Sequence, residues 1–162
     1  TGKTAAGRIL ADLLGLDFVD TDEMVEREAG LTVARIFETF GEARFRRMEA
    51  TAVARALGTP RAVIAMGGGA LLRPESRQRV RDKATVVWLW ASPEICAARA
   101  HVDRATRPLL AGQDPTQAIG RLLDDRLSTY ARAADLVLDT GHRTDEQVAR
   151  KITDEVDQTW PR

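Results

Sequence analysis

Cysteine and histidine are scarce in this sequence of 162 residues, which has one cysteine and two histidines. A single cysteine cannot form a disulfide within the chain, and Cys96, His101 and His142 lack the spacing of zinc ligands. The sequence therefore argues against a disulfide-stabilised secreted domain and against a zinc site. It fits a reducing compartment, and we expect a cytoplasmic protein.

Long apolar runs and an excess of either charge are also absent. No stretch approaches the roughly 20 apolar residues of a membrane-spanning helix, and 24 basic residues are balanced by 24 acidic ones. A neutral chain has no general attraction to nucleic acid or to an anionic membrane, so we expect neither partner. The length and the 44% hydrophobic content fit one globular domain over residues 1–162, which we expect to be a monomer.

The first residues, Gly2-Lys3-Thr4, match the end of a phosphate-binding loop. A complete loop has a strand, a glycine and four spacer residues ahead of Gly-Lys-Ser/Thr, and its backbone N–H groups surround a polyphosphate at the start of a helix. A helical pattern does follow here, and Gly15 is placed to end it. We therefore expect that the chain begins inside the loop and that an intact domain has one more strand ahead of Thr1.

Short apolar runs alternate with amphipathic helical segments along the chain. This alternation predicts an α/β fold, a three-layer α/β/α sandwich whose mostly parallel sheet is covered on both faces. The predicted strands are Leu16–Val19, Val63–Met66, Val86–Trp90 and Leu136–Leu138. The predicted helices are Lys3–Leu14, Asp22–Glu28, Val33–Phe40, Glu42–Leu57, Pro74–Asp82, Pro93–His101, Pro115–Ala131 and Asp145–Trp160.

Two carboxylates, Asp20 and Asp22, follow the first predicted strand within Asp20-Thr21-Asp22. Ligands of open α/β sheets bind at the carboxyl ends of parallel strands, so Asp20 is a candidate magnesium ligand and Asp22 a candidate partner of a substrate hydroxyl. Alternatively, Asp22 or Thr21 simply caps the following helix. The motif alone leaves both interpretations open.

The segment Phe45-Arg46-Arg47-Met48-Glu49 lies within a charged helical pattern. Arg46 and Glu49 are three residues apart, and such pairs usually lie on a solvated helix face. Taken alone, this segment favours that structural interpretation over a substrate-binding one.

Three consecutive glycines, Gly67-Gly68-Gly69, follow the second predicted strand. Glycines at this place expose backbone N–H groups and allow a ligand to approach the main chain closely. A tight turn needs only one glycine, so the triplet favours a binding role.

Between His101 and Gln113 the helical pattern lapses, which predicts a surface loop and a candidate lid over about 101–113. Within it, Arg107 of Arg107-Pro108-Leu109-Leu110 is placed to reach a transferring phosphoryl group.

Arg126 and Tyr130 lie one turn apart on the helix that follows. Arg126 is a candidate carboxylate clamp. Alternatively, Arg126 forms an ion pair with Asp124, Asp125 or another helix. The alternative for Tyr130 is that its ring lies at the edge of the core and its hydroxyl at the surface.

In this order, these motifs resemble shikimate kinase over nearly the whole chain. The resemblance implies the P-loop, nucleoside-monophosphate-kinase-like α/β/α fold. It also implies that ATP, with Mg²⁺, phosphorylates the 3-hydroxyl of shikimate on the way to aromatic amino acids. One departure is Leu127-Ser128-Thr129, where the family usually has a proline and a leucine between the arginine and the tyrosine.

The resemblance also implies a role for each matched residue, with the substrate-binding region at about 21–57. The nucleotide would be bound by Gly2, Lys3, Thr4 and Arg107, with Arg104 or Arg99 near the adenine. Thr4 and Asp20 would hold magnesium, and Asp22, Lys3 and Arg107 would be catalytic. Shikimate would be bound by Asp22, Arg46, Gly67, Gly68, Gly69 and Arg126, with Glu49 orienting Arg46.

Two alternatives remain beside the shikimate kinase interpretation. Another small-metabolite kinase of this fold, such as a gluconate kinase, is disfavoured because two arginines at the substrate suit a carboxylated ring. A metabolite-sensing domain of a transcription regulator could dispense with the carboxylates, yet Asp20 and Asp22 are both present. We therefore favour the enzyme.

Overall fold

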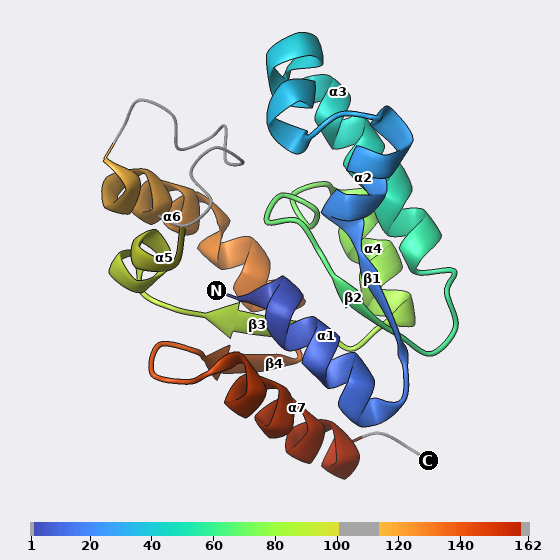
Figure 1. Cartoon of the computed structure of the whole chain (residues 1–162), viewed down its shortest axis with the longest axis vertical. Helices are drawn as coiled ribbons and strands as arrows, with labels where there is room; N and C mark the ends of the chain where they lie inside the picture. The colour runs from blue at the N-terminus through green and yellow to red at the C-terminus, as the bar shows by residue number, and fades with distance from the viewer. Residues whose placement is uncertain (1, 101–113, 160–162) are drawn as a thin grey trace.

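The computed structural model describes residues 2–100 and 114–159, and its helices and strands alternate along the chain (Figure 1). The elements are α1 (Lys3–Leu14), β1 (Asp17–Asp20), α2 (Thr21–Ala29), α3 (Val33–Ala56), β2 (Ala62–Ala65), α4 (Pro74–Lys83), β3 (Val87–Trp90), α5 (Pro93–Ala100), α6 (Pro115–Ala133), β4 (Leu136–Asp139) and α7 (Asp145–Thr159). Each predicted helix and strand is present, with bounds that move by only one or two residues.

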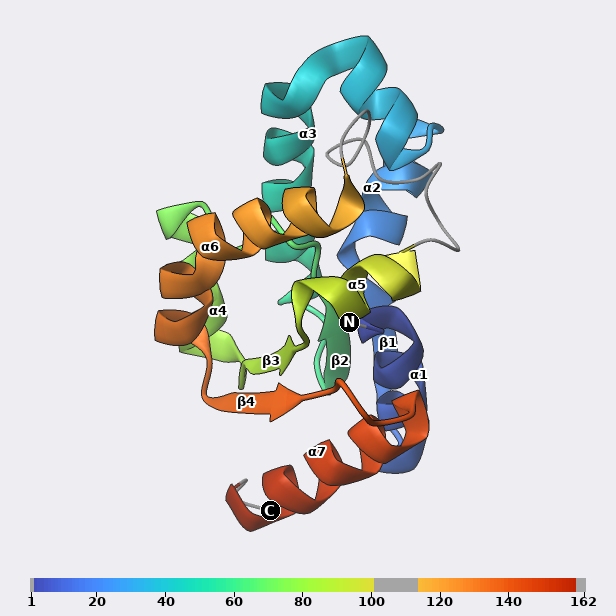
Figure 2. The same ribbon diagram turned by 90° about the vertical axis from the view of Figure 1, so that its left-hand side faces the viewer.

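Helix α3 is broken at Gly41, where the sequence predicts the boundary between two helices. Gly41 has φ 74° and ψ 169°, a conformation that favours glycine because a Cβ would be strained there. The two arms of α3 run in different directions from this point (Figure 2). The second arm carries Phe45, Arg46 and Glu49, so the break sets the direction from which these side chains reach the strands.

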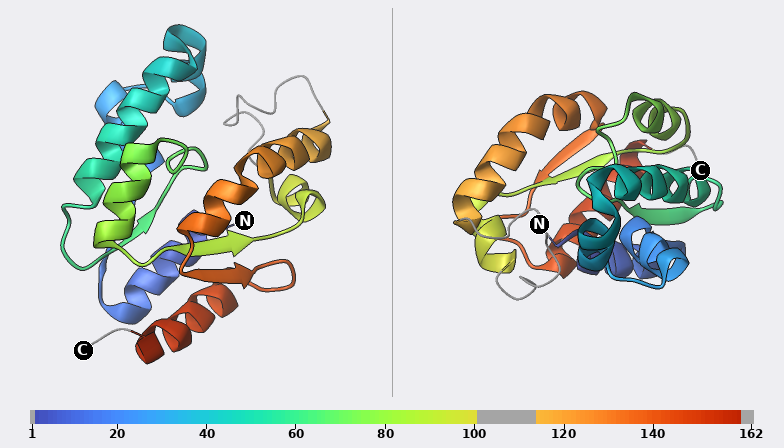
Figure 3. Two further views of the ribbon diagram at one scale, coloured as in Figure 1. Left: turned by 180° about the vertical axis from the view of Figure 1, so that it is seen from behind. Right: turned by 90° about the horizontal axis from the view of Figure 1, so that it is seen from above.

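The four strands of the described residues form two parallel pairs. In the first pair Asp20 lies opposite Ala65, and in the second Trp90 lies opposite Asp139. The predicted parallel strands are therefore present, and within the described residues no strand joins β2 to β3 (Figure 3). Since β1 and β2 are parallel and in register, the segments that follow Asp20 and Ala65 emerge side by side.

A cleft of about 1220 Å³ lies between the two pairs of strands and extends to the carboxyl ends of β1 and β2. Apolar side chains of both pairs line it, among them Ile64, Met66, Leu89 and Trp90. The cleft separates β2 from β3, so each pair lacks a neighbouring strand on that side. A central strand ahead of Thr1 stays a prediction.

Among the described residues, buried apolar side chains form three clusters. Helices α1 and α7 pack together with β4 through Leu10, Leu138 and Ile152. Val53, Leu71 and Val80 join α3 to α4, and Val25, Ile36 and Phe45 join α2 to α3. Within the described part of the chain, every helix is too short or too polar to cross a membrane.

Candidate active site

The carboxylate of Asp20, at the end of β1, makes two kinds of contact. Its Oδ1 accepts hydrogen bonds from the backbone N–H of Asp22 (2.9 Å) and Glu23 (3.3 Å), so Asp20 is the N-cap of α2. Its Oδ2 accepts a hydrogen bond from the hydroxyl of Thr4 on α1 at 2.8 Å. The prediction that Asp22 or Thr21 caps this helix is therefore wrong, because Asp20 already has the extended backbone that an N-cap requires.

Thr21 is fully buried and joins the two strand ends. Its hydroxyl accepts a hydrogen bond from the backbone N–H of Gly67 at 3.1 Å and lies 3.4 Å from the carbonyl oxygen of Ala65. The contact fixes the glycine turn against the start of α2. This role was not predicted from the sequence, where its only signal is a threonine between two aspartates.

The carboxylate of Asp22 is largely buried, and its Oδ1 has no hydrogen-bond partner among the described residues. Burial, the strongest cause, together with the negative charges of Asp20 and Glu49, raises the pKa of Asp22 from 3.8 to about 6, although Lys3 opposes the shift. An unpartnered carboxylate oxygen with this pKa is suited to accept a proton near neutral pH.

Replacing Asp22 by asparagine should stabilise the ligand-free chain above pH 6. The raised pKa means that ionised Asp22 costs folding free energy, a cost that is absent below pH 3.8 and complete above about 6. We expect a gain of about 2 kcal/mol at pH 8, less than the roughly 3 kcal/mol of the full shift because the amide is also buried. The gain should vanish near pH 4.

Chemical denaturation at both pH values measures this difference. Asp154→Asn, at an exposed site on α7, is the matched control and should change little at either pH. An Asp22→Asn variant that is less stable than the parent at pH 8 would show that ionised Asp22 does not lower the folding stability.

Arg46 and Glu49 form an ion pair that is much less exposed than the sequence predicts. Nη1 of Arg46 lies 2.8 Å from Oε2 of Glu49, and Glu49 is only 2% exposed. Burial raises the pKa of Glu49, against the opposing effect of Arg46. For Arg46, burial alone would lower the pKa, but its bonds to Glu49 and Glu42 outweigh that effect and raise it. The solvated-face interpretation is therefore wrong for Glu49.

The three glycines form a turn that the protein's own charged side chains approach closely. A Cβ at Gly67 would lie 2.6 Å from Oδ1 of Asp22 and 2.7 Å from Oε1 of Glu49, and one at Gly69 would overlap the guanidinium of Arg46. The φ angles of these glycines are not positive. Glycine is therefore needed here for space, and not for an unusual backbone conformation.

Gly67→Ala should destabilise the protein by about 1–3 kcal/mol, because the new methyl group must displace two buried carboxylates. Gly120→Ala on α6 is the control, since its Cβ would meet only Cγ of Pro93, at 4.0 Å. That change should stabilise the protein by about 0.5–1 kcal/mol through helix propensity. Thermal unfolding of the two variants compares them, and equal midpoints would contradict the steric argument.

Arg126 and Tyr130 of α6 both donate hydrogen bonds to the carbonyl oxygen of Gly68, Arg126 through Nη1 at 3.1 Å. The Tyr130 ring also packs on Trp88, with centroids 5.7 Å apart. The ion-pair alternative for Arg126 is wrong, because Arg126 has no ion pair within the described residues. Tyr130 lies at the edge of the core as its alternative expected, and its hydroxyl contacts the glycine turn. Arg126 also lowers the pKa of Glu49, so it lies near the Arg46–Glu49 pair.

The start of α1 faces this site. Lys3 is near enough to Asp22 to influence its pKa, and both line the same cleft as Thr4. Gly2 has φ 80°, and a Cβ there would lie 2.5 Å from Oδ1 of Asp145. Both the positive φ and the lack of space for a Cβ therefore require glycine at this position.

Only one of the remaining residues that were predicted to bind the nucleotide lies within the described part of the chain. Arg107 and Arg104, with the predicted lid, lie outside the described residues. Arg99 is described, and it donates hydrogen bonds to the carbonyl oxygen (2.7 Å) and to the hydroxyl (3.1 Å) of Thr140. Its guanidinium therefore fastens α5 to the end of β4.

Metal binding by protein side chains alone is not supported among the described residues, which include no group of three or more histidine, cysteine, aspartate or glutamate side chains placed to hold an ion. The Thr4 hydroxyl and the Asp20 carboxylate nevertheless meet at 2.8 Å beside Lys3. Two hard oxygen donors suit magnesium, which usually completes its octahedral shell with water and substrate phosphates.

Comparison with known proteins agrees with this geometry. The family model for shikimate kinase matches residues 1–157. The chain belongs to the shikimate kinase family. A shikimate kinase of Symbiobacterium thermophilum is 45% identical over 100% of this chain and 94% of the relative. One of Methylococcus capsulatus is 39% identical over 99% of this chain and 89% of the relative.

A solved shikimate kinase of Acinetobacter baumannii, in complex with shikimate, superimposes with a TM-score of 0.94 and 32% identity. The alignment covers 99% of this chain and 89% of that one. This match confirms the P-loop kinase fold and the α/β class expected of a shikimate kinase. ATP and Mg²⁺ are the cofactors of this family.

Proposed function

We propose that this chain is the kinase domain that transfers the γ-phosphoryl group of ATP to the 3-hydroxyl of shikimate. The observation that carries the proposal is the meeting, in one cleft, of the unpartnered Asp22 oxygen with Arg46 and Arg126. An acceptor for a hydroxyl proton beside two guanidinium groups suits a substrate that has both a hydroxyl and a carboxylate.

The substrate carboxylate binds Arg46 and Arg126, which reach the glycine turn from α3 and α6. Glu49 holds Arg46 in place through the 2.8 Å ion pair, and Gly68 positions Arg126 through its carbonyl oxygen. Both guanidinium groups retain N–H donors for a ligand, because each has five. The ring lies beside the turn formed by Gly67 to Gly69, next to the charged side chains that approach this turn.

Asp22 orients the 3-hydroxyl and accepts its proton while the oxygen forms its bond to the γ-phosphorus and ADP leaves. The reaction needs ionised Asp22, so its rate should fall as the pH drops through about 6 in the ligand-free enzyme. Lys3 binds the β- and γ-phosphates beside the N-terminus of α1, where backbone N–H groups also face the anion. Arg107 is the proposed partner of the γ-phosphate, and Arg104 or Arg99 the proposed partner of the adenine.

Thr4 and Asp20 hold the magnesium ion that accompanies ATP. When bound, this ion neutralises charge on the β- and γ-phosphates. The Thr4 hydroxyl oxygen and Oδ2 of Asp20 would be the donors to this ion, while Oδ1 of Asp20 caps α2.

The cleft between β2 and β3 takes one further parallel strand, which leads through a glycine-bearing loop into Gly2. Apolar side chains of both strand pairs line this cleft, as a central strand buried on both faces requires. Residues 1–162 then form one kinase domain that begins within its phosphate loop, with the substrate-binding region at about 21–57 and the lid at about 101–113. The domain works as a cytoplasmic monomer.

The proposal is tested in a chain extended ahead of Thr1 by an apolar strand, a glycine and three spacer residues, which completes the phosphate loop. A coupled assay of ADP release should show turnover with shikimate but not with gluconate. Turnover with gluconate would favour another sugar-acid kinase. Binding of shikimate without turnover in the extended chain would favour a sensor domain, and turnover by the 162-residue chain itself would show that the added strand is not required.

A further inference from the structure

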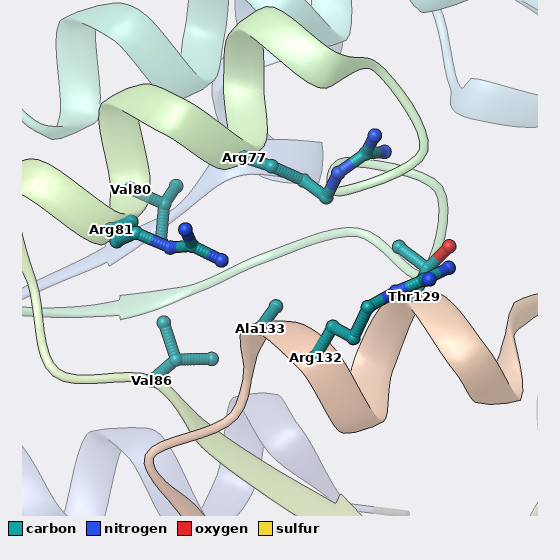
Figure 4. A pocket seen from close by; sticks show the side chains of 7 residues that line it. All are labelled: Arg77, Val80, Arg81, Val86, Thr129, Arg132 and Ala133. Atoms are coloured by element: carbon teal, nitrogen blue, oxygen red, sulfur yellow. The ribbon is translucent and has the colours of Figure 1, made fainter.

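A second, smaller cavity of about 260 Å³ lies between α4 and α6, separate from the residues assigned to the reaction. Figure 4 shows the side chains that surround it, which come from both helices and from the segment before β3. They are Arg77, Val80, Arg81, Val86, Thr129, Arg132 and Ala133.

The lining of this cavity combines three positive charges with an apolar floor. Arg77 and Arg81 come from α4 and Arg132 from α6, and the lining contains no carboxylate. Val80 and Val86 are 2% and 8% exposed and form the floor. Three guanidinium groups around one hollow repel one another, so an anion placed among them is favoured.

Within the described residues, none of these three guanidinium groups forms an ion pair. Arg81 makes no hydrogen bond or ion pair with the described residues, and Arg132 contacts only the hydroxyl of Ser128, at 3.2 Å. Two carboxylates that are close along the chain, Asp82 and Asp135, form no ion pair with these arginines. Asp82 accepts a hydrogen bond from the side chain of Gln78, and Asp135 accepts one from the backbone N–H of Val86, both at 2.8 Å.

Arg77 has a double role. Its Nη1 donates hydrogen bonds to the carbonyl oxygens of Leu71 and Leu72, both at 2.8 Å, in the segment that follows the glycine turn. Carbonyl groups do not cancel its charge, so Arg77 adds to the field in the cavity while its position is fixed.

We propose that this cavity binds a compact phosphate monoester. The phosphate group is held by Arg81 and Arg132, whose planar guanidinium groups match its oxygens in pairs, and by the Thr129 hydroxyl. The organic part lies on Val80, Val86 and Ala133. The cavity volume of about 260 Å³ equals that of about nine water molecules. This space is enough for a small ester but not for a nucleoside triphosphate.

The same helix connects this cavity to the candidate active site. Thr129 and Arg132 flank Tyr130, whose hydroxyl donates to the carbonyl oxygen of Gly68. A ligand at the cavity should therefore also alter the affinity for shikimate. This consequence rests on the proposed function, whereas binding of the ester itself does not.

Titration of the ¹⁵N-labelled 162-residue chain with phenyl phosphate, at constant ionic strength in chloride, tests the proposal by NMR. We expect saturable shifts at the amides of Val86, Thr129 and Ala133, with a Kd of about 1 mM or lower. The double variant Arg81→Gln/Arg132→Gln should raise the Kd at least about tenfold. Both residues are exposed, so these changes should leave the fold intact.

The matched control is Arg79→Gln/Arg121→Gln, which removes the same charge from exposed sites on the same two helices outside the cavity. It should change the Kd less than about twofold. An equal loss in both double variants would overturn the proposal in favour of general charge attraction.

Two further results would also overturn it. Shifts confined to the start of α1 and abolished by Lys3→Ala would place the anion at the phosphate loop instead. Inorganic phosphate should bind several-fold more weakly than phenyl phosphate, because it lacks the apolar part that covers Val80 and Val86. Equal affinities would show a simple phosphate site and contradict the assignment of a monoester.

Discussion

Asp22→Asn is expected to lower turnover with shikimate by about two orders of magnitude or more, while the affinities for shikimate and ATP change only modestly. The asparagine amide has the same shape and can still contact the hydroxyl, but it cannot accept the proton that leaves as the new P–O bond forms. Steady-state kinetics in the extended chain, with calorimetric titration of each substrate, separates the two effects.

Two observations would contradict this role for Asp22. One is normal turnover by the asparagine variant. The other is a pH profile of kcat/KM for the unchanged enzyme that shows no loss of activity below about pH 6, the value to which burial and the neighbouring carboxylates raise the pKa of Asp22. The asparagine variant should be more stable than the parent at pH 8, so a loss of activity there cannot be attributed to unfolding.

Arg126→Ala should weaken shikimate binding by about 2–4 kcal/mol, which is about 30- to 1000-fold, with little effect on ATP affinity. The guanidinium is held by the carbonyl oxygen of Gly68 and lies near the Arg46–Glu49 pair, so its loss removes one side of a carboxylate site. Calorimetric titration with shikimate measures the change.

Arg121→Ala is the control for Arg126→Ala, because Arg121 is an exposed residue of the same helix that does not line the cleft. Arg126→Lys should restore only part of the affinity, since an ammonium group keeps the charge but not the paired geometry. If shikimate affinity is unchanged in Arg126→Ala while ATP affinity falls, Arg126 belongs to the nucleotide site instead.

Local patterns in the sequence were sufficient for the helices and strands. The left-handed glycine at position 15 ends α1, Gly41 divides α3, and Thr144 caps α7 by accepting a hydrogen bond from the N–H of Gln147 at 3.2 Å. Each of these signals acts over a few residues, so it can be recognised in the chain before the fold is known. The order of motifs also identified the family.

The environments of the charged residues depended on the tertiary structure. Arg46 and Glu49 are close in sequence and were correctly paired, yet nothing local indicated that Glu49 would be buried against Gly67. Asp20 was expected to be a magnesium ligand, and Asp22 or Thr21 was the alternative cap of the helix. In the structure one oxygen of Asp20 caps α2 and the other accepts a hydrogen bond from Thr4. The capping role of Asp20 became clear only from its extended backbone.

The sequence by itself thus determined the elements, the fold class and the family, because these depend on periodicity, caps and the order of motifs. Only the tertiary structure decided that Asp22 has an unpartnered oxygen, that Glu49 is buried, and that Arg126 reaches the carbonyl of Gly68, 58 residues away along the chain. Burial and electrostatic interactions depend on distances in space between distant segments. A single sequence contains no direct record of those distances.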